Sequence, residues 1–151
     1  TLWARLSPLP DGRWLFSRIL GRMVPYSSSI GATMLHLESG HARGRIRDRR
    51  RVRNHLGSVH AVALANLGEL STGLALIGAL DPNTRGILTG LEVTYLKKAR
   101  GVLEAEAQCS IPDVTSEVEQ SVEVQIRDTD GEVVAVAQAR WLLSPVPGTH
   151  K

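Results

Sequence analysis

The chain has 151 residues, of which 42% are hydrophobic and 22% are charged. This length and composition suit one globular domain with a core, and they exclude a disordered tail or a disulfide-stapled miniprotein. The formal net charge of +3 is unevenly spread, because residues 42–53 carry +6 and everything else sums to −3. A single basic segment is therefore expected instead of a uniformly basic surface. Its seven arginines are Arg43, Arg45, Arg47, Arg49, Arg50, Arg51 and Arg53.

The lone Cys109 excludes an intramolecular disulfide and a cysteine-rich zinc site. A reducing, cytoplasmic setting is expected, and no metal site is predicted. Charged residues, among them Arg5 and Asp11, interrupt the pattern of a secretion signal, so secretion is not expected.

The first half of the chain predicts one short helix followed by two extended segments. Residues 11–24 repeat apolar side chains at four-residue steps, with Asp11 as a cap and Pro25 at the end. Residues 32–38 and 42–52 are then expected to be extended. Arginine at every odd position of the second segment, through Arg53, would place six arginines on one strand face.

Residues 58–80 predict an unusually apolar helix, closed by the turn Asp81-Pro82-Asn83. The stretch 59–80 is long enough to span a bilayer, but a carboxylate at Glu69 in mid-membrane would cost roughly 3 kcal/mol. We therefore expect a buried helix of a soluble domain.

Beyond this helix the hydrophobic period changes to two, which is typical of strands. Asp130-Gly131 is typical of a tight hairpin. These elements predict an α+β domain in which an antiparallel sheet wraps around the long helix. The four expected strands are residues 88–96, 102–109, 118–127 and 133–142.

The segment that opens the long helix carries the candidate chemistry. With Ser58 as N-cap, the backbone N–H groups of His60 and Ala61 would lie in the first turn, where donors lack intrahelical partners. Such donors polarise a carbonyl and stabilise an oxyanion. The side chains of Asn54 and His60 would add further donors.

Glu69 is the candidate base or nucleophile, because it is the one charged residue between Arg53 and Asp81. A buried carboxylate is costly unless it is paired or has a chemical role. The alternative is an interface residue whose carboxylate is satisfied by the hydroxyl of Ser71 or Thr72.

His60 and Glu69 cannot share one substrate on one helix. Nine residues separate them by roughly 13.5 Å along the axis and about 180° around it. If they cooperate, Glu69 comes from another subunit, and a two-fold dimer carries two equivalent composite sites.

The pattern Asn54-x5-His60-x8-Glu69, with the later segment 95–101 and the Asp130-Gly131 hairpin, resembles the hotdog-fold acyl-CoA thioesterases. It is most similar to the phenylacetate-pathway type and its relatives of unknown function, over roughly residues 32–143. The resemblance implies a hotdog domain over 32–145, an N-terminal helical extension over 1–31 and a tail over 146–151.

The resemblance also implies roles for individual residues. His60 and the Ala61 N–H would bind the thioester carbonyl, Asn54 would assist, and Glu69 of the partner subunit would attack or activate water. Two departures are that many relatives have Gly at Ala61, and that thioesterases often have Pro at Lys98.

Basic residues offer candidate contacts to coenzyme A. The resemblance places Lys97, Lys98 and Arg100 near its phosphates, and Gly57 near the substrate. The arginines of 43–53 have three interpretations: a solvated edge that prevents strand pairing, a docking surface for coenzyme A phosphates, or a nucleic-acid contact. We favour the first, and no helix-turn-helix or stacking motif supports nucleic acid.

The remaining histidines and aromatics have no predicted chemistry. His36, His41 and His55 are expected to be structural or solvent-facing. The N-terminal helix and its aromatics Trp14, Phe16 and Tyr26 are expected to pack on the domain, with a lid over the acyl pocket as the alternative.

The hypothesis is thus a cytoplasmic hydrolase of fatty or aromatic acyl-CoA, built as a homodimer or a dimer of dimers. It would need no cofactor beyond the coenzyme A of its substrate, and neither membrane nor nucleic acid is an expected partner. The alternative is a non-catalytic acyl-CoA-binding or sensing protein of the same fold.

Overall fold

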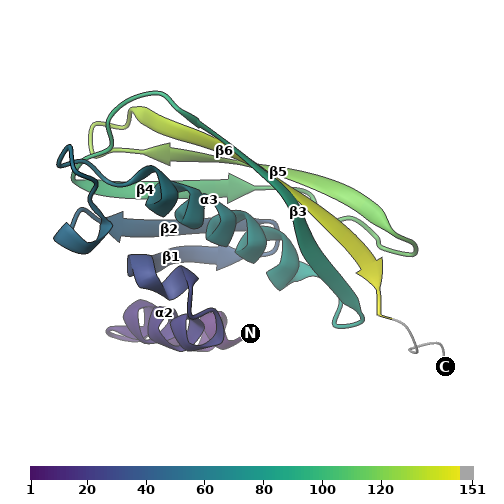
Figure 1. Ribbon diagram of the computed structural model, residues 1–151. Helices are drawn as coiled ribbons and strands as arrows, with labels where there is room; N and C mark the ends of the chain where they lie inside the picture. Colours follow the sequence, from purple (N-terminus) through teal and green to yellow (C-terminus); the bar gives the residue numbers. More distant parts are fainter. Residues whose placement is uncertain (147–151) are drawn as a thin grey trace.

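The computed structural model describes residues 1–146 (Figure 1). Residues 147–151, which make up most of the expected tail 146–151, lie outside the described part. The helices are α1 (Leu2–Leu6), α2 (Gly12–Met23), η1 (Ser27–Ile30), η2 (Arg50–Val52), α3 (Ala61–Leu76) and η3 (Ile77–Ala79). The strands are β1 (Thr33–Glu38), β2 (His41–Arg47), β3 (Thr84–Tyr95), β4 (Val102–Gln108), β5 (Val118–Arg127) and β6 (Val133–Pro145).

The six strands form one antiparallel sheet in the order β1-β2-β4-β5-β6-β3. Helix α3 lies across one face of this sheet and contacts β2, β4, β5 and β6, while α2 packs beside β1 (Figure 1). The expected antiparallel sheet with a long central helix and an additional N-terminal helix is confirmed.

Small residues let the sheet approach α3 closely. A Cβ added to Gly68 of the helix would lie 3.1 Å from the Cβ of Ala137 and 3.4 Å from Val124. On the sheet, the space above Gly44 is filled by Met34 of β1 and by Leu67 and Ser71 of α3, all of them buried. Fully buried alanines occupy the neighbouring strand positions: Ala42, Ala105, Ala107, Ala135, Ala137 and Ala139.

The expected helix of residues 58–80 is a core helix, as predicted. By length and composition, residues 61–79 could cross a membrane. However, α3 is packed against the sheet, and ten of its sixteen residues are buried. Its start differs from the expectation, because the N-cap is His60 and not Ser58. The Ser58 hydroxyl donates instead to Asn54 Oδ1, at 3.2 Å, so it is not available to cap the helix.

The prediction that six arginines share one strand face is wrong. Strand β2 ends at Arg47, which pairs with Val102 at the start of β4. The partner strand is preceded by the turn at Gly101, whose φ is +72°, so the ladder cannot continue. The chain then bends, with the Asp48 N–H donating to the Gly101 carbonyl, and the later arginines lie on η2 and its flanks.

The N-terminal region also differs in detail from the expectation. Helix α1 was not predicted. Asp11 is the N-cap of α2, but it has a left-handed φ of +57° and its carboxylate makes no capping hydrogen bond. Phe16 of α2 is buried and meets Trp3 of α1 edge-on, with ring centroids 5.0 Å apart. Trp3 and Phe16 thus tie the two helices together, whereas Trp14 and Tyr26 are exposed and do not pack on the domain as expected.

Truncating the centre of the helix–sheet contact should destabilise the protein strongly. Leu67→Ala removes a fully buried side chain, and we expect the free energy of unfolding to fall by about 2–5 kcal/mol in urea titrations. The matched control is Leu9→Ala, since Leu9 is 55% exposed; it should change stability by less than about 0.5 kcal/mol. Equal effects of the two substitutions would contradict this description of the core.

Candidate functional site

Hydrogen bonds at the start of α3 determine how His60 can act. Its Nδ1 accepts from the Val62 N–H at 3.0 Å, so in the neutral ring the proton is on Nε2, on an exposed side chain. The backbone N–H of His60 donates to the Val52 carbonyl at 2.7 Å. In contrast, the Ala61 N–H has no acceptor within residues 1–146. Two donors, His60 Nε2–H and Ala61 N–H, are therefore free here.

The loop before the helix is organised by Asn54. Its Oδ1 accepts from the N–H groups of Leu56, at 2.9 Å, and Ser58, at 3.2 Å. Gly57 has a φ of +70°, a conformation that favours glycine. The amide nitrogen of Asn54 has no acceptor among the described residues, so it remains available for the predicted donor role. Gly57 contributes the turn.

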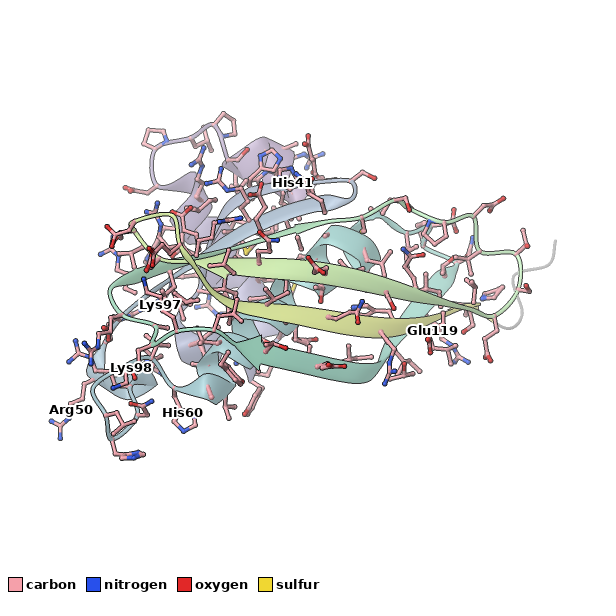
Figure 2. All side chains as sticks on the ribbon, turned by 90° about the horizontal axis from the view of Figure 1, so that it is seen from above. His41, Arg50, His60, Lys97, Lys98 and Glu119 are labelled. Carbon is pink, nitrogen blue, oxygen red and sulfur yellow. The ribbon has the colours of Figure 1, made fainter. Side chains whose placement is uncertain are left out.

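The segment between β3 and β4 is attached to the same end of α3. The Tyr95 hydroxyl donates to the Ala61 carbonyl at 2.9 Å, and the Val59 N–H donates to the Ala99 carbonyl at 2.8 Å. The exposed Lys98 next to Ala99 lies at the same end of the molecule as His60 (Figure 2). The fold thus brings the predicted substrate-binding loop to the predicted carbonyl-binding residues.

The three predicted phosphate ligands are not equivalent. Lys97 Nζ is ion-paired to Asp128, at 2.9 Å, and to Glu132. These two carboxylates raise the Lys97 pKa above its usual value and occupy its ammonium group. Lys98 and Arg100 are exposed and have no such partner among the described residues. They are the cations that remain free to meet a phosphate.

Glu69 lies in the middle of α3, away from these donors. Its carboxylate has no hydrogen-bond or ion-pair partner among residues 1–146, and burial raises its pKa above the usual value. Within the described chain, neither Ser71 nor Thr72 satisfies this carboxylate. Both hydroxyls donate to backbone carbonyls, Ser71 to that of Leu67 and Thr72 to that of Glu69 itself. The acid is therefore partly buried and uncompensated.

A second polar group of α3 escaped the sequence analysis. Asn66 is 8% exposed, and its Oδ1 is buried without a hydrogen-bond partner in the described structure. It precedes Glu69 by three positions, so the two side chains lie on neighbouring parts of the helix surface. Its signal in the sequence is an amide within an otherwise apolar run.

Two other clusters were also missed. His36 and His41 were expected to be structural or solvent-facing, but they converge with Glu38 across the turn between β1 and β2. Several arginines of residues 43–53 meet α2 around a pocket. The first was signalled by the spacing His36-x-Glu38-x2-His41, and the second required knowledge of where α2 packs.

Hydrogen-bond donors and a carboxylate, the groups that an acyl-transfer reaction requires, lie in two separate places in this chain. Donors for a carbonyl oxygen stand at the N-terminus of α3, where the helix dipole favours negative charge. The carboxylate of Glu69 is nine positions farther along, about 13.5 Å by helical rise. One chain alone does not bring Glu69 to His60.

Comparisons with known proteins agree with this fold. The family model "Domain of unknown function (DUF4442)" matches residues 12–143, a range that includes α2. A structural-genomics protein of known structure is 31% identical, with 96% of each chain covered and a TM-score of 0.82. A Pseudomonas aeruginosa protein of unknown function, named a probable thioesterase, is 26% identical over 91% of this chain and 97% of its own, with a TM-score of 0.79.

More distant structures share the fold. The Staphylococcus aureus thioesterase SAV0944 is 17% identical and superposes with a TM-score of 0.71, over 80% of this chain and 99% of its own. No curated protein sequence matches the chain. The many thioesterase-family hotdog proteins among the structural neighbours, together with the match over residues 12–143, lead to one assignment: this chain belongs to the DUF4442 family and has the hotdog fold of the thioesterases.

Proposed function

We propose that this protein is an acyl-CoA thioesterase whose site is shared by two subunits. The observation that carries the proposal is the uncompensated carboxylate of Glu69 in the apolar central helix. A partly buried acid without a partner lowers the stability of the fold, and such groups are concentrated where chemistry requires them. Buried Asn66, with its free Oδ1, adds a second polar group on the same stretch of helix.

The donors at the start of α3 supply the complementary half of the reaction. His60 Nε2–H and the Ala61 N–H can both point at a carbonyl oxygen, since neither is used within the described chain. Charge develops on that oxygen when the carbonyl carbon becomes tetrahedral, and preorganised donors stabilise it. The Ala61 residue still offers its N–H where many thioesterases have glycine, so donor capacity is kept.

The reaction follows from these roles. The ionised Glu69 either takes a proton from water, whose oxygen attacks the thioester carbon, or attacks that carbon itself. In both routes the tetrahedral oxyanion lies on the donors of His60 and Ala61. Its collapse breaks the carbon–sulfur bond, and coenzyme A leaves as the thiolate, which is then protonated. In the second route, water hydrolyses the resulting anhydride and restores Glu69.

A homodimer would bring the two halves together. Strand β3 is at an edge of the sheet and pairs only with β6 in the chain described here. It carries exposed apolar residues, Ile87 at 56%, Leu91 at 37% and Tyr95 at 46%. Exposed apolar edge strands are prone to pair with another chain. Pairing of β3 with its copy is the arrangement we propose, with Glu69 of one subunit serving His60 of the other.

The distant thioesterases offer further support. Two solved structures of the Staphylococcus aureus protein SAV0944 are of variants, one with a glutamine replaced by alanine and the other with a glutamate replaced by alanine. Their separation along that chain equals the separation of Asn54 and Glu69 here. Lys98 lies at the same end of the molecule as His60 (Figure 2), and with the exposed Arg100 it would supply cations for the phosphates of coenzyme A.

The proposal predicts release of free thiol from a panel of short, long and aromatic acyl-CoAs. Glu69→Gln should lower kcat by about 100-fold or more, because it removes the base or nucleophile but retains the shape. Since the carboxylate must be ionised, kcat should fall as the pH drops through the Glu69 pKa, which burial places above its usual value. Thiol release can be followed spectroscopically across the pH range.

The matched control is Glu119→Gln, an exposed acid near the opposite end of the sheet from His60 (Figure 2). It should leave turnover within about two-fold of the unmodified protein. Because the folded state favours protonated Glu69, the acid stabilises below its unfolded pKa and this contribution is lost as the pH rises. Glu69→Gln should therefore be at least as stable at neutral pH. Tight acyl-CoA binding without thiol release would instead support the non-catalytic binding protein.

A further inference from the structure

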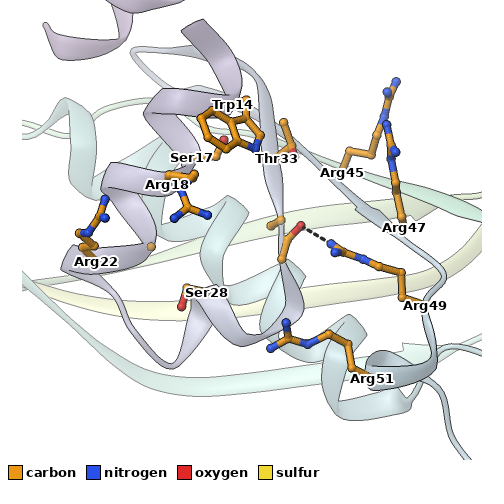
Figure 3. Close-up of a pocket in the computed structure, with 13 residues that line it drawn as sticks. Trp14, Ser17, Arg18, Arg22, Ser28, Thr33, Arg45, Arg47, Arg49 and Arg51 are labelled. Atoms are coloured by element: carbon orange, nitrogen blue, oxygen red, sulfur yellow. Dashed lines mark hydrogen bonds between the residues drawn. The ribbon is translucent and has the colours of Figure 1, made fainter. Parts of the chain in front are cut away.

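A pocket of about 650 Å³ lies between α2 and the end of β2 (Figure 3). Its volume is in the range of small-molecule sites. Neither Asp nor Glu is among its described lining residues. The charged residues that line it are Arg18, Arg22, Arg45, Arg47, Arg49 and Arg51.

Few of these arginines have a counter-charge within the described chain. Arg45 is neutralised by Glu104, with Nη2 2.6 Å from Oε1. The Arg49 Nη2 donates to the Gly31 carbonyl at 3.2 Å, a neutral partner. For Arg22, Arg47 and Arg51, no carboxylate is within ion-pair distance among residues 1–146. The pocket is therefore lined by several positive charges and, among its described lining residues, by no carboxylate.

Clustered like charges repel, so this arrangement is stabilised when an anion enters it. We propose that the pocket binds an oligophosphate group, the chemistry carried by a nucleoside diphosphate. Guanidinium groups match phosphate oxygens with paired hydrogen bonds, and several such groups around one cavity favour a ligand with more than one phosphate. The concave shape favours a compact ligand over an extended nucleic acid.

Two glycines and one tryptophan shape the walls of the pocket. Gly31 has a φ of +65°, and a Cβ there would lie 2.4 Å from Arg49 Nη2, so glycine makes room for that guanidinium. Gly21 of α2 allows similarly close packing, since its Cβ would lie 2.9 Å from that of Ser28. Trp14 on α2 supplies an aromatic face and already holds Arg18, whose Cζ is 5.1 Å from the ring centroid.

Two sources could supply the phosphates. One is a free nucleotide, and the other is the nucleotide part of coenzyme A. Coenzyme A is included because the pocket adjoins the start of α3. Arg51, which lines the pocket, precedes Val52, and the Val52 carbonyl accepts the His60 N–H. Binding of oligophosphate does not depend on thioesterase turnover, so the inference survives if the proposed function fails.

The test is isothermal titration calorimetry of the full chain with three probes: inorganic pyrophosphate, ADP and coenzyme A. We expect all three to bind, and the double variant Arg22→Ala/Arg47→Ala to weaken each by about tenfold or more. The matched control, Arg13→Ala/Arg50→Ala, removes the same charge from α2 and η2 but from positions that do not line the pocket. It should change the affinities by less than about threefold at fixed ionic strength.

Each outcome decides a point. Coenzyme A that binds no tighter than ADP assigns the pocket to a free nucleotide. Tighter binding of coenzyme A, with a raised KM for acyl-CoA and an unchanged kcat in Arg22→Ala/Arg47→Ala, assigns it to the substrate's nucleotide. Absence of pyrophosphate and ADP binding overturns the proposal, as does an equal loss in the control variant. Binding of duplex DNA or RNA through these arginines, without pyrophosphate binding, would also overturn it.

A separate cluster on the β1–β2 hairpin carries a second inference, contrary to the expectation of no metal site. His36 Nε2 lies 3.0 Å from Glu38 Oε1, and His41 Nδ1 lies 3.6 Å from the same oxygen. The three ligand atoms lie within 4.8 Å of one another. Ligand atoms around a tetrahedral zinc ion are about 3.3 Å apart.

The surroundings of His41 support a metal ligand. While Nδ1 faces Glu38, the other ring nitrogen, Nε2, is 2.8 Å from Glu106 Oε1 on β4. Histidine ligands commonly donate their second ring N–H to a carboxylate, which orients the ring and strengthens the ligand. The geometry points to a zinc-type divalent cation held by His36, Glu38 and His41, with Glu106 as the orienting residue.

Zinc titration of chelator-treated protein tests this second site. One equivalent of Zn²⁺ should bind and raise the unfolding temperature, because the metal binds the folded hairpin. His36→Ala should weaken zinc binding by about tenfold or more, while the matched control His55→Ala, an exposed loop histidine, should not. No zinc-dependent stabilisation, or equal binding by His36→Ala and the unmodified chain, would overturn it.

Discussion

The close packing of α3 against a sheet face of small residues is the contact on which the rest of the structure depends. A Cβ on Gly68 would lie only 3.1 Å from the Cβ of Ala137, so the missing side chain is what lets the helix axis come this close to the sheet. That axis places His60 at the end of the helix, beside the loops before α3 and after β3. It also places Glu69 midway along the helix. The positions of both halves of the candidate site therefore follow from one packing constraint.

Charged side chains without a counter-charge occur in two places in this molecule. Glu69 lacks a partner in an apolar helix, and Arg22, Arg47 and Arg51 lack carboxylate partners around one pocket. Neither arrangement helps the isolated chain to fold, because burial penalises the acid and the arginines repel. Our proposals assign each arrangement to a molecule from outside the chain, namely a thioester and a second subunit for Glu69 and an oligophosphate for the arginines.

Features encoded locally were predictable from the sequence, and features that depend on distant residues were not. Period-two patterning and the Asp130-Gly131 turn gave strand β5 with its observed bounds and located the other strands. The end of β2 at Arg47 depended on the turn at Gly101 in its partner strand. Likewise, the helix start moved to His60 because Asn54 captures the Ser58 hydroxyl. The sequence singled out the candidate residues, but their hydrogen bonds could be described only from the fold.

The most direct test of the central claim, that His60 and Glu69 cooperate only across two subunits, is complementation. Glu69→Gln and His60→Ala chains are each purified, exchanged in equal amounts and assayed for thiol release. The account predicts that each variant alone is inactive and that the mixture recovers about one quarter of the unmodified activity. Half of the dimers are then mixed, and each has one intact site of two. No recovery, despite subunit exchange shown by mass spectrometry, would contradict it.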